Sequence, residues 1–317
     1  MKKIITGGFL MALTLNLFAT PNLIEKKDFE SASIKNLYVE LASENIEIFE
    51  TAASDFGIEI YCNNKQYIPQ VKVKDSTLSI IRQKEFNISL FRYSRCDIKL
   101  FIPQEKNFNE IEIETSSAEI DINTDLTAGK IKISSTSGEI ESNSCLYADN
   151  IKIKSTSGDI NVKNLDADDI AIESSSGEIE LGSYTGGTGS LRTTSGEISC
   201  EAFASEYANF DSNSGKITVK NLDCDYFDSE TTSGAQYFVF QNAPIAKSNI
   251  TSTSGSIDLT VPKSANFEIE VHSNSGSFKD GFSNNKFVPR QSFHEKINAG
   301  GAVINVSTTS GSIELDY

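Results

Sequence analysis

The sequence predicts an all-β protein, a right-handed parallel β-solenoid with rungs of 19–21 residues. A Ser-Gly pair recurs nine times, apolar residues alternate with polar ones on both sides of each pair, and no stretch has helical periodicity of useful length. The glycines of the pairs are Gly138, Gly158, Gly177, Gly196, Gly215, Gly234, Gly255, Gly276 and Gly311. Successive intervals are 20, 19, 19, 19, 19, 21, 21 and 35 residues, and Ala118 stands at the same place in a tenth copy.

The first 19 residues are typical of an export signal. Two lysines precede an apolar stretch, and the small residue Ala19 stands where cleavage before Thr20 requires it. The stretch is too short for a comfortable transmembrane helix. No Cys lies near the cleavage point, so the sequence does not indicate a bacterial lipid anchor. We therefore expect residues 1–19 to be a signal peptide. The mature protein is expected to be exported to the periplasm, the outer surface or the medium, with no membrane span of its own.

Residues 20–105 are expected to form an N-terminal β region that caps the repeats or begins them in degenerate form. Apolar and polar residues alternate here, as at positions 37–41 and 98–102, and Pro103 closes the last run. Such alternation is typical of strands with one buried side.

In the repeats, residues 106–317, apolar side chains fall at fixed positions relative to each glycine. Positions −7 and −5 before the glycine and +2 and +4 after it are mostly Ile, Leu, Val or Phe, and a Leu often follows at +7 or +8. Two strands in each copy therefore turn alternate side chains inward, and the Ser-Gly corner separates them. One copy cannot bury these residues alone, so the copies must stack at about 4.8 Å, with Ile over Ile. The right hand follows the rule for parallel crossovers.

We expect the corner glycine to adopt a positive φ, which a tight change of direction often needs. The neighbouring Ser and Thr hydroxyls can bond to each other or to corner amides on adjacent rungs. The alternative fold is a compact β-sandwich of antiparallel strands. A sandwich, however, does not require the same residue at the same phase nine times.

Two stretches depart from the repeat. Ala235-Gln236-Tyr237 replaces the usual acidic-Ile-polar triplet, and a Phe-rich insertion at 278–300 lengthens the last interval. A solenoid must cover its terminal edges, because open edges recruit other chains. We therefore expect the insertion to fold over the last rung as a cap rather than to form a binding loop.

The chain has five cysteines, and an odd number in an exported protein leaves at least one unpaired. Cys62 and Cys96 both lie in the N-terminal region and can pair. Cys145, Cys200 and Cys224 occupy different phases of the repeat, so no stacked pair is expected. None of the five has the spacing of a zinc or redox motif, and we expect buried, unreactive thiols.

The pattern resembles a bacterial family known as putative adhesins, a domain of unknown function with β-solenoid character. The resemblance rests on SIKNLYVELASENIEIFE, IKLFIPQEKNFNEIEIETSSAEIDI, the repeated T/S-S-G-E/D-I and the closing GGAVINVSTTSGSIELDY. It covers about residues 28–317. It implies a surface or envelope role and supplies no catalytic residues.

A file of carboxylates follows the corner glycines at position +1. Its members are Glu119, Glu139, Asp159, Glu178 and Glu197, and Lys216 comes next. At rung spacing, adjacent members would stand about 5 Å apart and repel each other by about 1 kcal/mol or less in water. A divalent cation between rungs would remove this repulsion, and oxygen ligands suit calcium, so Glu139, Asp159, Glu178 and Glu197 are a candidate calcium site. A solvated file without a cation explains the same residues.

We expect no catalytic residues and no other cofactor. Carboxylate pairs such as Glu139 with Glu141 are a by-product of strand alternation. No acidic or Cys motif accompanies His272 or His294, and the chain has no Trp to form a sugar platform. The Ser of Ser-Gly recurs nine times, whereas a nucleophile is needed once. An extracellular β-helix carbohydrate-active enzyme is therefore kept only as an alternative.

The net charge is −16, and residues 111–317 hold 30 acidic residues against 14 basic ones. Such a surface disfavours nucleic acid and anionic lipid. We expect a non-enzymatic, adhesin-like or scaffolding protein of the bacterial envelope or cell surface that binds protein or glycan along a polar β-face. A purely structural spacer is the other alternative. The sequence names neither the partner nor the oligomeric state.

Overall fold

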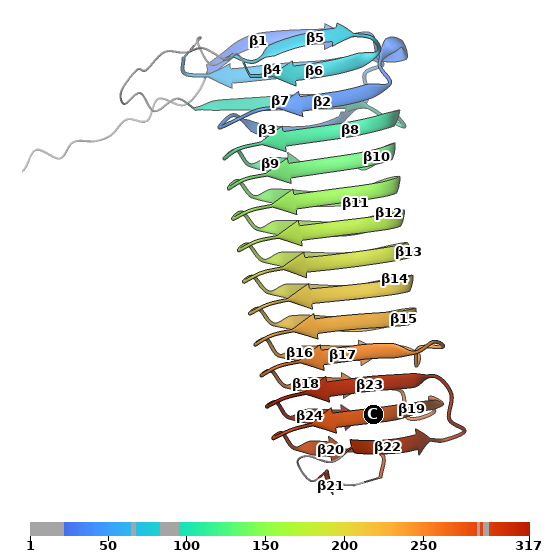
Figure 1. Cartoon of the computed structure of the whole chain (residues 1–317). Coiled ribbons are helices and arrows are strands. Elements are labelled where there is room, and N and C mark those ends of the chain that lie inside the picture. The colour runs from blue at the N-terminus through green and yellow to red at the C-terminus, as the bar shows by residue number, and fades with distance from the viewer. Residues whose placement is uncertain (1–21, 65–67, 83–94, 284–285, 288–291) are drawn as a thin grey trace, which may run out of the picture.

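The computed structural model describes residues 22–64, 68–82, 95–283, 286–287 and 292–317, which form an elongated stack of β-strands (Figure 1). The all-β prediction is confirmed: the described residues contain 24 strands in one mixed sheet and, besides the short 3-10 helix η1 (Ser31–Ser33), no helix. Accordingly, no helix in this part of the chain is long and apolar enough to cross a membrane. The predicted signal peptide lies outside the described residues.

The repeating unit is one long strand that bends once and is followed by a tight corner. Five consecutive strands have this form: β11 (Ile140–Ser155), β12 (Ile160–Ser174), β13 (Ile179–Thr193), β14 (Ile198–Ser212) and β15 (Ile217–Thr231). Each pairs in parallel with the next. Ile lies over Ile at the start of all five strands, as in Ile160↔Ile179, and also at the far end of β11 and β12, as in Ile151↔Ile170. The antiparallel β-sandwich alternative is therefore wrong for the repeats, while the right hand of the coil stays a prediction.

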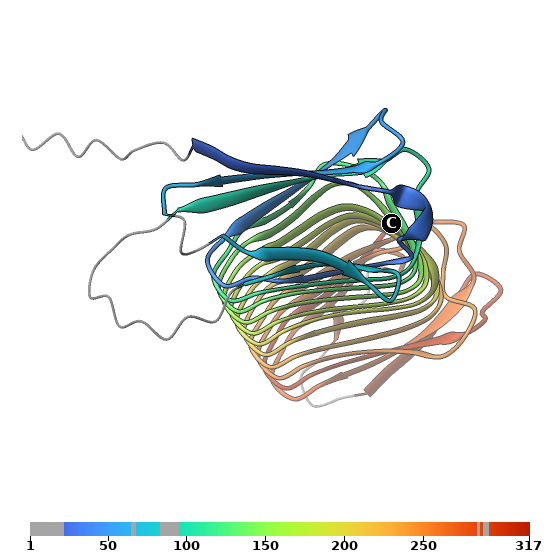
Figure 2. The same ribbon diagram turned by 90° about the horizontal axis from the view of Figure 1, so that it is seen from above.

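The bend divides every rung into two sides that face each other across the core (Figure 2). We call the part before the bend, such as residues 140–142, the short side, and the part after it, such as 145–154, the long side. Each rung is named by its corner glycine.

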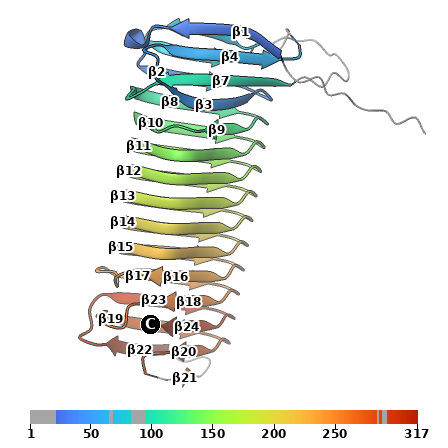
Figure 3. The same ribbon diagram turned by 180° about the vertical axis from the view of Figure 1, so that it is seen from behind.

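Separate strands continue the two sides above and below this central part. Toward the N-terminus, β9 (Ile120–Ile122) lies on the short side, and β8 (Asn107–Thr115) and β10 (Leu126–Ser135) lie on the long side. Toward the C-terminus, β16 (Gln236–Phe240) and β18 (Ile257–Thr260) continue the short side, and β17 (Ser248–Ser252) continues the long side. The regular stack is visible from behind in Figure 3.

Each corner glycine lies against the corner of the neighbouring rung. A Cβ atom on Gly158 would lie 2.0 Å from the carbonyl oxygen of Gly138, and the nine corner glycines have this contact at 1.6–2.1 Å. The expected positive φ is wrong, because Gly300 is the one glycine with a positive φ among the described residues. The corner needs glycine for the space that a side chain would fill, not for its backbone freedom.

A hydroxyl three residues before the glycine holds the corner. In seven corners it accepts the glycine N–H at 2.8–3.0 Å: Ser135, Ser174, Thr193, Ser212, Ser252, Ser273 and Thr308. The expected bonds to amides of adjacent rungs are thus replaced by bonds within one corner. A hydroxyl pair does join two rungs at Thr231 and Ser252, 3.2 Å apart.

The core changes from aliphatic to aromatic along the stack. Inward residues are mainly Ile and Leu up to β12, whereas Tyr184, Phe203, Phe210 and Phe227 fill the core from β13 to β15. Rings that touch have centroids 4.8–6.1 Å apart. Gly189 makes room for them, since a Cβ atom there would lie 2.3 Å from Phe203.

The irregular triplet Ala235-Gln236-Tyr237 places an amide in the core. Gln236 stands at the usual Ile position and is fully buried. Ser229 Oγ donates to its Oε1 at 2.7 Å, while its Nε2 donates to Thr231 Oγ1 at 3.0 Å and to the Thr251 carbonyl at 2.6 Å. Because the amide is bonded at both ends, this rung keeps the register of its neighbours.

At the N-terminal end the rungs are not stacked in chain order. β2 (Asn36–Glu40) and β3 (Asn45–Thr51) lie between β8–β9 and the later strands β6 (Thr77–Ile81) and β7 (Cys96–Pro103), parallel to both. Three antiparallel strands, β1 (Asn22–Phe29), β4 (Phe56–Cys62) and β5 (Gln70–Lys74), cover this end. Cys62 and Cys96 form a disulfide that joins β4 to β7, the pairing that the sequence allowed.

The C-terminal end has the same kind of inversion. β23 (Val303–Thr308) and β24 (Ile313–Asp316) lie between β17–β18 and the earlier strands β19 (Phe267–Ser273) and β20 (Phe278–Asp280), parallel to both. The insertion contributes β21 (Lys286–Phe287) and β22 (Ser292–Ile297), which pair antiparallel with β20 and β19. It therefore covers the Gly276 rung, which is the last rung of the stack, and the expected cap is confirmed.

Candidate functional site

The predicted acidic file lies on the outer surface beside the corners. Glu139, Asp159 and Glu197 are exposed, and Glu178 is half-buried. Glu139 Oε1 accepts a hydrogen bond from Asn161 Nδ2 at 2.8 Å, and Asp159 Oδ1 accepts one from the Glu178 N–H at 2.8 Å. Both bonds run between rungs. The structure thus places the four residues in one file, and these two carboxylates bond along the stack.

No group of three or more His, Cys, Asp or Glu among the described residues is arranged to hold a metal ion. Calcium binding by the acidic file stays a prediction.

A second row of acidic residues runs beside the first on the short side. Asp121 pairs with Glu47 of β3 on one side and with Glu141 of β11 on the other. Burial first, and then the charges of Glu141 and Glu119, raise the pKa of Asp121 to about 6. Burial and the neighbouring carboxylates of two rows thus both disfavour the charged form of Asp121.

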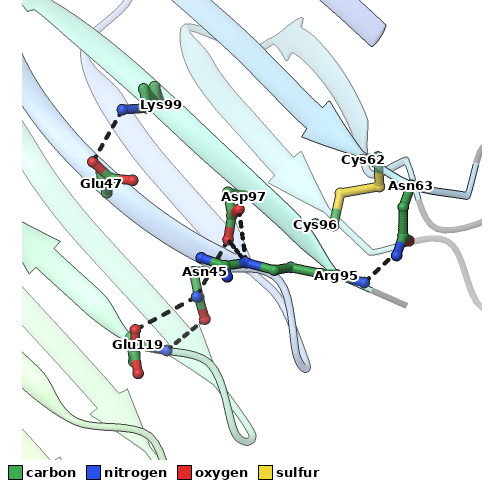
Figure 4. Close-up of polar contacts among 9 residues, drawn as sticks. All are labelled: Asn45, Glu47, Cys62, Asn63, Arg95, Cys96, Asp97, Lys99 and Glu119. Atoms are coloured by element: carbon green, nitrogen blue, oxygen red, sulfur yellow. Dashed lines mark hydrogen bonds and ion pairs between the residues drawn. A yellow bond between two sulfur atoms is a disulfide. The ribbon is translucent and has the colours of Figure 1, made fainter. Parts of the chain in front are cut away.

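At the N-terminal end of these rows the carboxylates have cation and amide partners (Figure 4). Lys99 Nζ lies 3.3 Å from Glu47 Oε2. Asn45 bridges two strands, because its Nδ2 donates to Asp97 Oδ1 at 3.3 Å and its Oδ1 accepts the N–H of Glu119 at 3.1 Å. These contacts join β3 to β7 and to the corner before β9, which fits a structural role for this cluster.

A shallow hollow of about 310 Å³ opens on the short side near the bend of β11 to β14. Its lining includes Glu141, Asn161, Lys163, Glu180 and Gly182. Gly182 has no room for a side chain, since a Cβ atom would lie 2.2 Å from the Lys163 carbonyl oxygen. The hollow is open and most of its lining residues are polar or charged, unlike the enclosed, mostly apolar sites that hold small substrates.

The long side carries a ladder of polar and aromatic residues in consecutive rungs, which the sequence analysis missed. We call it the tyrosine–asparagine ladder. It consists of Ser190, Asn209, Asp228, Asn249 and Asn305 at position −6 and of Tyr207 and Tyr226 at position −8. All seven residues are half-buried. The signal was present in the sequence, since polar residues recur at fixed outward positions between the inward apolar ones.

Hydrogen bonds fix the ladder along the stack. Asn305 Nδ2 donates to Asn249 Oδ1 at 2.9 Å, and Asn249 Nδ2 donates to Asp228 Oδ1 at 2.8 Å. Tyr226 donates to Asp228 Oδ2 at 2.7 Å, and Tyr207 donates to the same oxygen at 3.5 Å. The two rings stack with centroids 5.0 Å apart and planes 18° apart.

The electrostatics keep both tyrosines protonated. The hydrogen bond to Asp228 is the main cause that raises the pKa of Tyr226, and burial is the main cause that raises the pKa of Tyr207. Asn305 Oδ1 is buried and accepts no hydrogen bond from the described residues. The ladder thus presents fixed hydroxyl, amide and carboxylate groups at rung spacing beside an aromatic pair.

The residues considered for catalysis do not assemble into a site. Glu139 is exposed to water and bonds to an amide, and His272 is exposed. His294 Nε2 lies 3.4 Å from Glu268 Oε2 at the surface. In seven corners the hydroxyl three residues before the glycine accepts a backbone N–H, and this hydrogen bond holds it in the corner.

The three cysteines of the repeats are not in disulfides. Cys200 and Cys224 are buried, and burial is the main cause that raises the pKa of each thiol to about 12. Cys145 is half-buried, and burial also raises the pKa of its thiol. Such thiols are poor nucleophiles at neutral pH, as the sequence analysis expected.

Comparisons with known proteins identify the fold. The family model described as Toastrack DUF4097 matches residues 34–202 and 146–316. Among solved structures, a putative adhesin from Parabacteroides merdae is 14% identical with a TM-score of 0.50, and the match covers 92% of this chain and 96% of that one. A putative lipid binding protein from Parabacteroides distasonis is 17% identical with a TM-score of 0.47, at 92% and 96% coverage. The search of curated proteins finds no match.

Proposed function

Since the chain belongs to the Toastrack family DUF4097, we propose that it is a non-enzymatic, adhesin-like protein of the bacterial envelope that binds a glycan along the tyrosine–asparagine ladder. The proposal includes export by the signal peptide and a right-handed coil. It makes the stack of rungs a rigid scaffold for an extended binding surface.

The observation that carries the proposal is the ladder itself. Asp228 and the amides of Asn249 and Asn305 offer paired donors and acceptors, which suit the neighbouring hydroxyls of a sugar. Tyr207 and Tyr226 supply an apolar surface with polar tips, the combination that is enriched at recognition sites. Because the groups are fixed by hydrogen bonds to each other, little side-chain entropy would be lost on binding.

A non-enzymatic role is supported by the arrangement of the acidic and histidine side chains. A general acid and base must reach the same bond within hydrogen-bond distance. The acidic residues of the short side are instead spread over successive rungs, and His294 lies at the surface beside Glu268. The compared solved structure from Parabacteroides merdae is named an adhesin and not an enzyme.

The test is binding of the purified chain to an array of bacterial and host polysaccharides, followed by titration calorimetry with the best glycan. The double variant Tyr207→Ala/Tyr226→Ala should bind at least about tenfold more weakly, because both the apolar surface and two partners of Asp228 are lost. Tyr226→Phe, which keeps the ring, should lose less affinity.

The matched control is Tyr147→Ala/Tyr237→Ala, which removes two tyrosines that are 39% and 36% exposed and lie outside the ladder. Its affinity should equal that of the unchanged chain. Absence of glycan binding, or an equal loss in both double variants, would overturn the proposal. Capture of an envelope protein through the ladder would replace the glycan by a protein ligand.

A further inference from the structure

The Gly311 rung is inserted between two rungs that are consecutive in the chain. Ile250 of β17 and Val271 of β19 both pair with Val306 of β23. On the short side, Ile257 of β18 and Phe278 of β20 both pair with Ile313 of β24. Figure 1 shows β23 and β24 between these strands. We call the position between the Gly255 and Gly276 rungs the C-terminal slot.

The slot is shaped for one rung of this sequence. The Gly311 rung, which we call the occupant, buries Ile304, Val306, Ile313 and Leu315, each at most 1% exposed. It also pairs in parallel with both neighbours on both sides. Its corner stacks as the others do: a Cβ atom on Gly311 would lie 1.8 Å from the Gly255 carbonyl oxygen.

The two walls of the slot match each other as well as they match the occupant. Both pair with the same residues of the Gly311 rung in the same direction, so Ile250 would face Val271 and Ile257 would face Phe278 if the occupant left. Their glycines are separated by 21 residues, the interval found between the directly stacked Gly234 and Gly255 rungs. The occupant can therefore leave without destroying the register of what remains.

The occupant is joined to β22 by a segment suited to act as a hinge. Residues 298–302 read Asn-Ala-Gly-Gly-Ala, and Asn298 and Gly300 have φ values of 53° and 75°. The segment is held on the connection between β18 and β19 by Asn298 Nδ2, which donates to the carbonyls of Lys263 (3.0 Å) and Ala265 (2.7 Å). If the occupant moved to a second copy, these few polar contacts would be disturbed. Its strand pairing and core contacts would form again in the slot of that copy.

We propose that the C-terminal slot accepts residues 303–316 of a second copy of this chain, which gives strand-exchanged dimers. In such a dimer each slot is filled, and every rung contact of the monomer is formed again between copies. The free-energy difference from the monomer is then limited to the hinge and the entropy of association, as in domain swapping. The inference does not depend on the proposed glycan binding.

The N-terminal end has a similar inserted rung, β2–β3, but its flanking strands β1 and β4 pair with each other and hold it in its own copy. The disulfide between Cys62 and Cys96 joins β4, which follows β3, to β7, which lies outside it. In the part of the chain that the structure describes, the C-terminal slot is crossed by no disulfide. Exchange is therefore expected at the C-terminal end.

The test uses two full-length variants whose introduced cysteines come into register only when residues 303–316 are exchanged. One copy carries Asn249→Cys, in the wall of the slot, and the other carries Asn305→Cys, in the rung that fills it. The two asparagines are register partners, with Asn305 Nδ2 2.9 Å from Asn249 Oδ1. Both also carry Cys145→Ser. The two copies differ in a mass tag, are unfolded together, refolded over a range of protein concentrations and then oxidised. We expect a disulfide-linked heterodimer whose yield rises with protein concentration.

The control pair is Ser190→Cys with Asn209→Cys, which are register partners at the same outward position in the consecutive rungs β13 and β14. We expect the slot pair to exceed this control by about fivefold or more at high concentration, because mass action favours the dimer. Heterodimer at the level of the control would overturn the proposal.

A single-chain variant guards against misfolding. Asn249→Cys/Asn305→Cys in one copy should form an intramolecular disulfide, remain folded and stay monomeric on size exclusion after concentrated refolding. The unchanged chain, treated in the same way, should yield dimer. A dimer of equal amount in the locked variant would show that the association does not use the slot and would also overturn the proposal.

Discussion

At the scale of the residue, the corner glycine is fixed by a contact between rungs. The distance from a Cβ atom on Gly158 to the Gly138 carbonyl oxygen, 2.0 Å, is far below contact distance, and the nearest atom is backbone that cannot turn away. Gly158→Ala should therefore lower the free energy of unfolding by about 3 kcal/mol or more, as a severe case of overpacking. Urea unfolding followed by circular dichroism measures this loss.

Gly57 provides the matched control for that substitution. It lies within β4, and the nearest atoms to a Cβ atom there are 3.5 Å away on Phe101, an ordinary contact. Gly57→Ala should change the free energy of unfolding by less than about 1 kcal/mol. Equal stability of the two variants would contradict the steric account of the corner.

Asp121 provides the second test at the residue scale. Its pKa is about 6 in the folded chain against 3.8 for the free side chain, so the folded state binds the proton more tightly. A carboxyl group with a raised pKa destabilises the fold above pH 6, and this effect fades as the pH falls from 6 toward 4. Solvent screening of the partly exposed group limits it to about 1 kcal/mol.

Asp121→Asn should therefore be more stable than the unchanged chain at pH 7 and equally stable near pH 4. Thermal melts at a series of pH values measure the difference. Glu230→Gln, at an exposed position on the long side, is the control. A stability difference between Asp121→Asn and the unchanged chain that does not vary with pH would contradict the assigned pKa.

At the scale of the element, strands and their stacking were predictable because the inward pattern is local and repeated. The buried positions of each copy, such as Ile160 and Ile179, can be recognised from the alternation within that copy alone. Equal spacing between copies then brings these positions into register. Gln236 broke the pattern without changing the fold, since its amide found three partners that lie seven, five and fifteen residues away. Such partners are known only once neighbouring rungs are stacked.

The order of the rungs at the ends was not predictable from the same pattern. Ile250, Val271 and Val306 are β-branched apolar residues at the same position relative to their glycines, so the apolar pattern accepts each of them beside either of the others. The choice depends on connections such as residues 298–302, whose course is set by tertiary contacts. The acidic file was predicted from its phase, whereas the ladder was missed because the outward residues of the long side had not been followed.

At the scale of the whole molecule, we expect the stability to be roughly the sum of the stabilities of single rungs and of the contacts between neighbouring rungs. Each rung contacts the rungs above and below it, so the effect of a change should fade within a few rungs. The two ends differ from the middle because inserted rungs and antiparallel strands close them. Local unfolding should therefore begin at the ends and report on how each end is closed.

Removal of the N-terminal disulfide tests this view of the molecule. The bond closes a segment of 34 residues, and its loss through Cys62→Ala/Cys96→Ala should cost about 4 kcal/mol or less by the chain-entropy estimate. Hydrogen exchange followed by mass spectrometry should show faster exchange in β1, β4 and β7 and unchanged protection in β13 to β15. Cys145→Ser, which removes a thiol outside any disulfide, should alter neither region. A loss of protection that spreads evenly from β4 to β15 would mean that the stack unfolds as one cooperative unit, in which case the closure of an end would govern the stability of the entire coil.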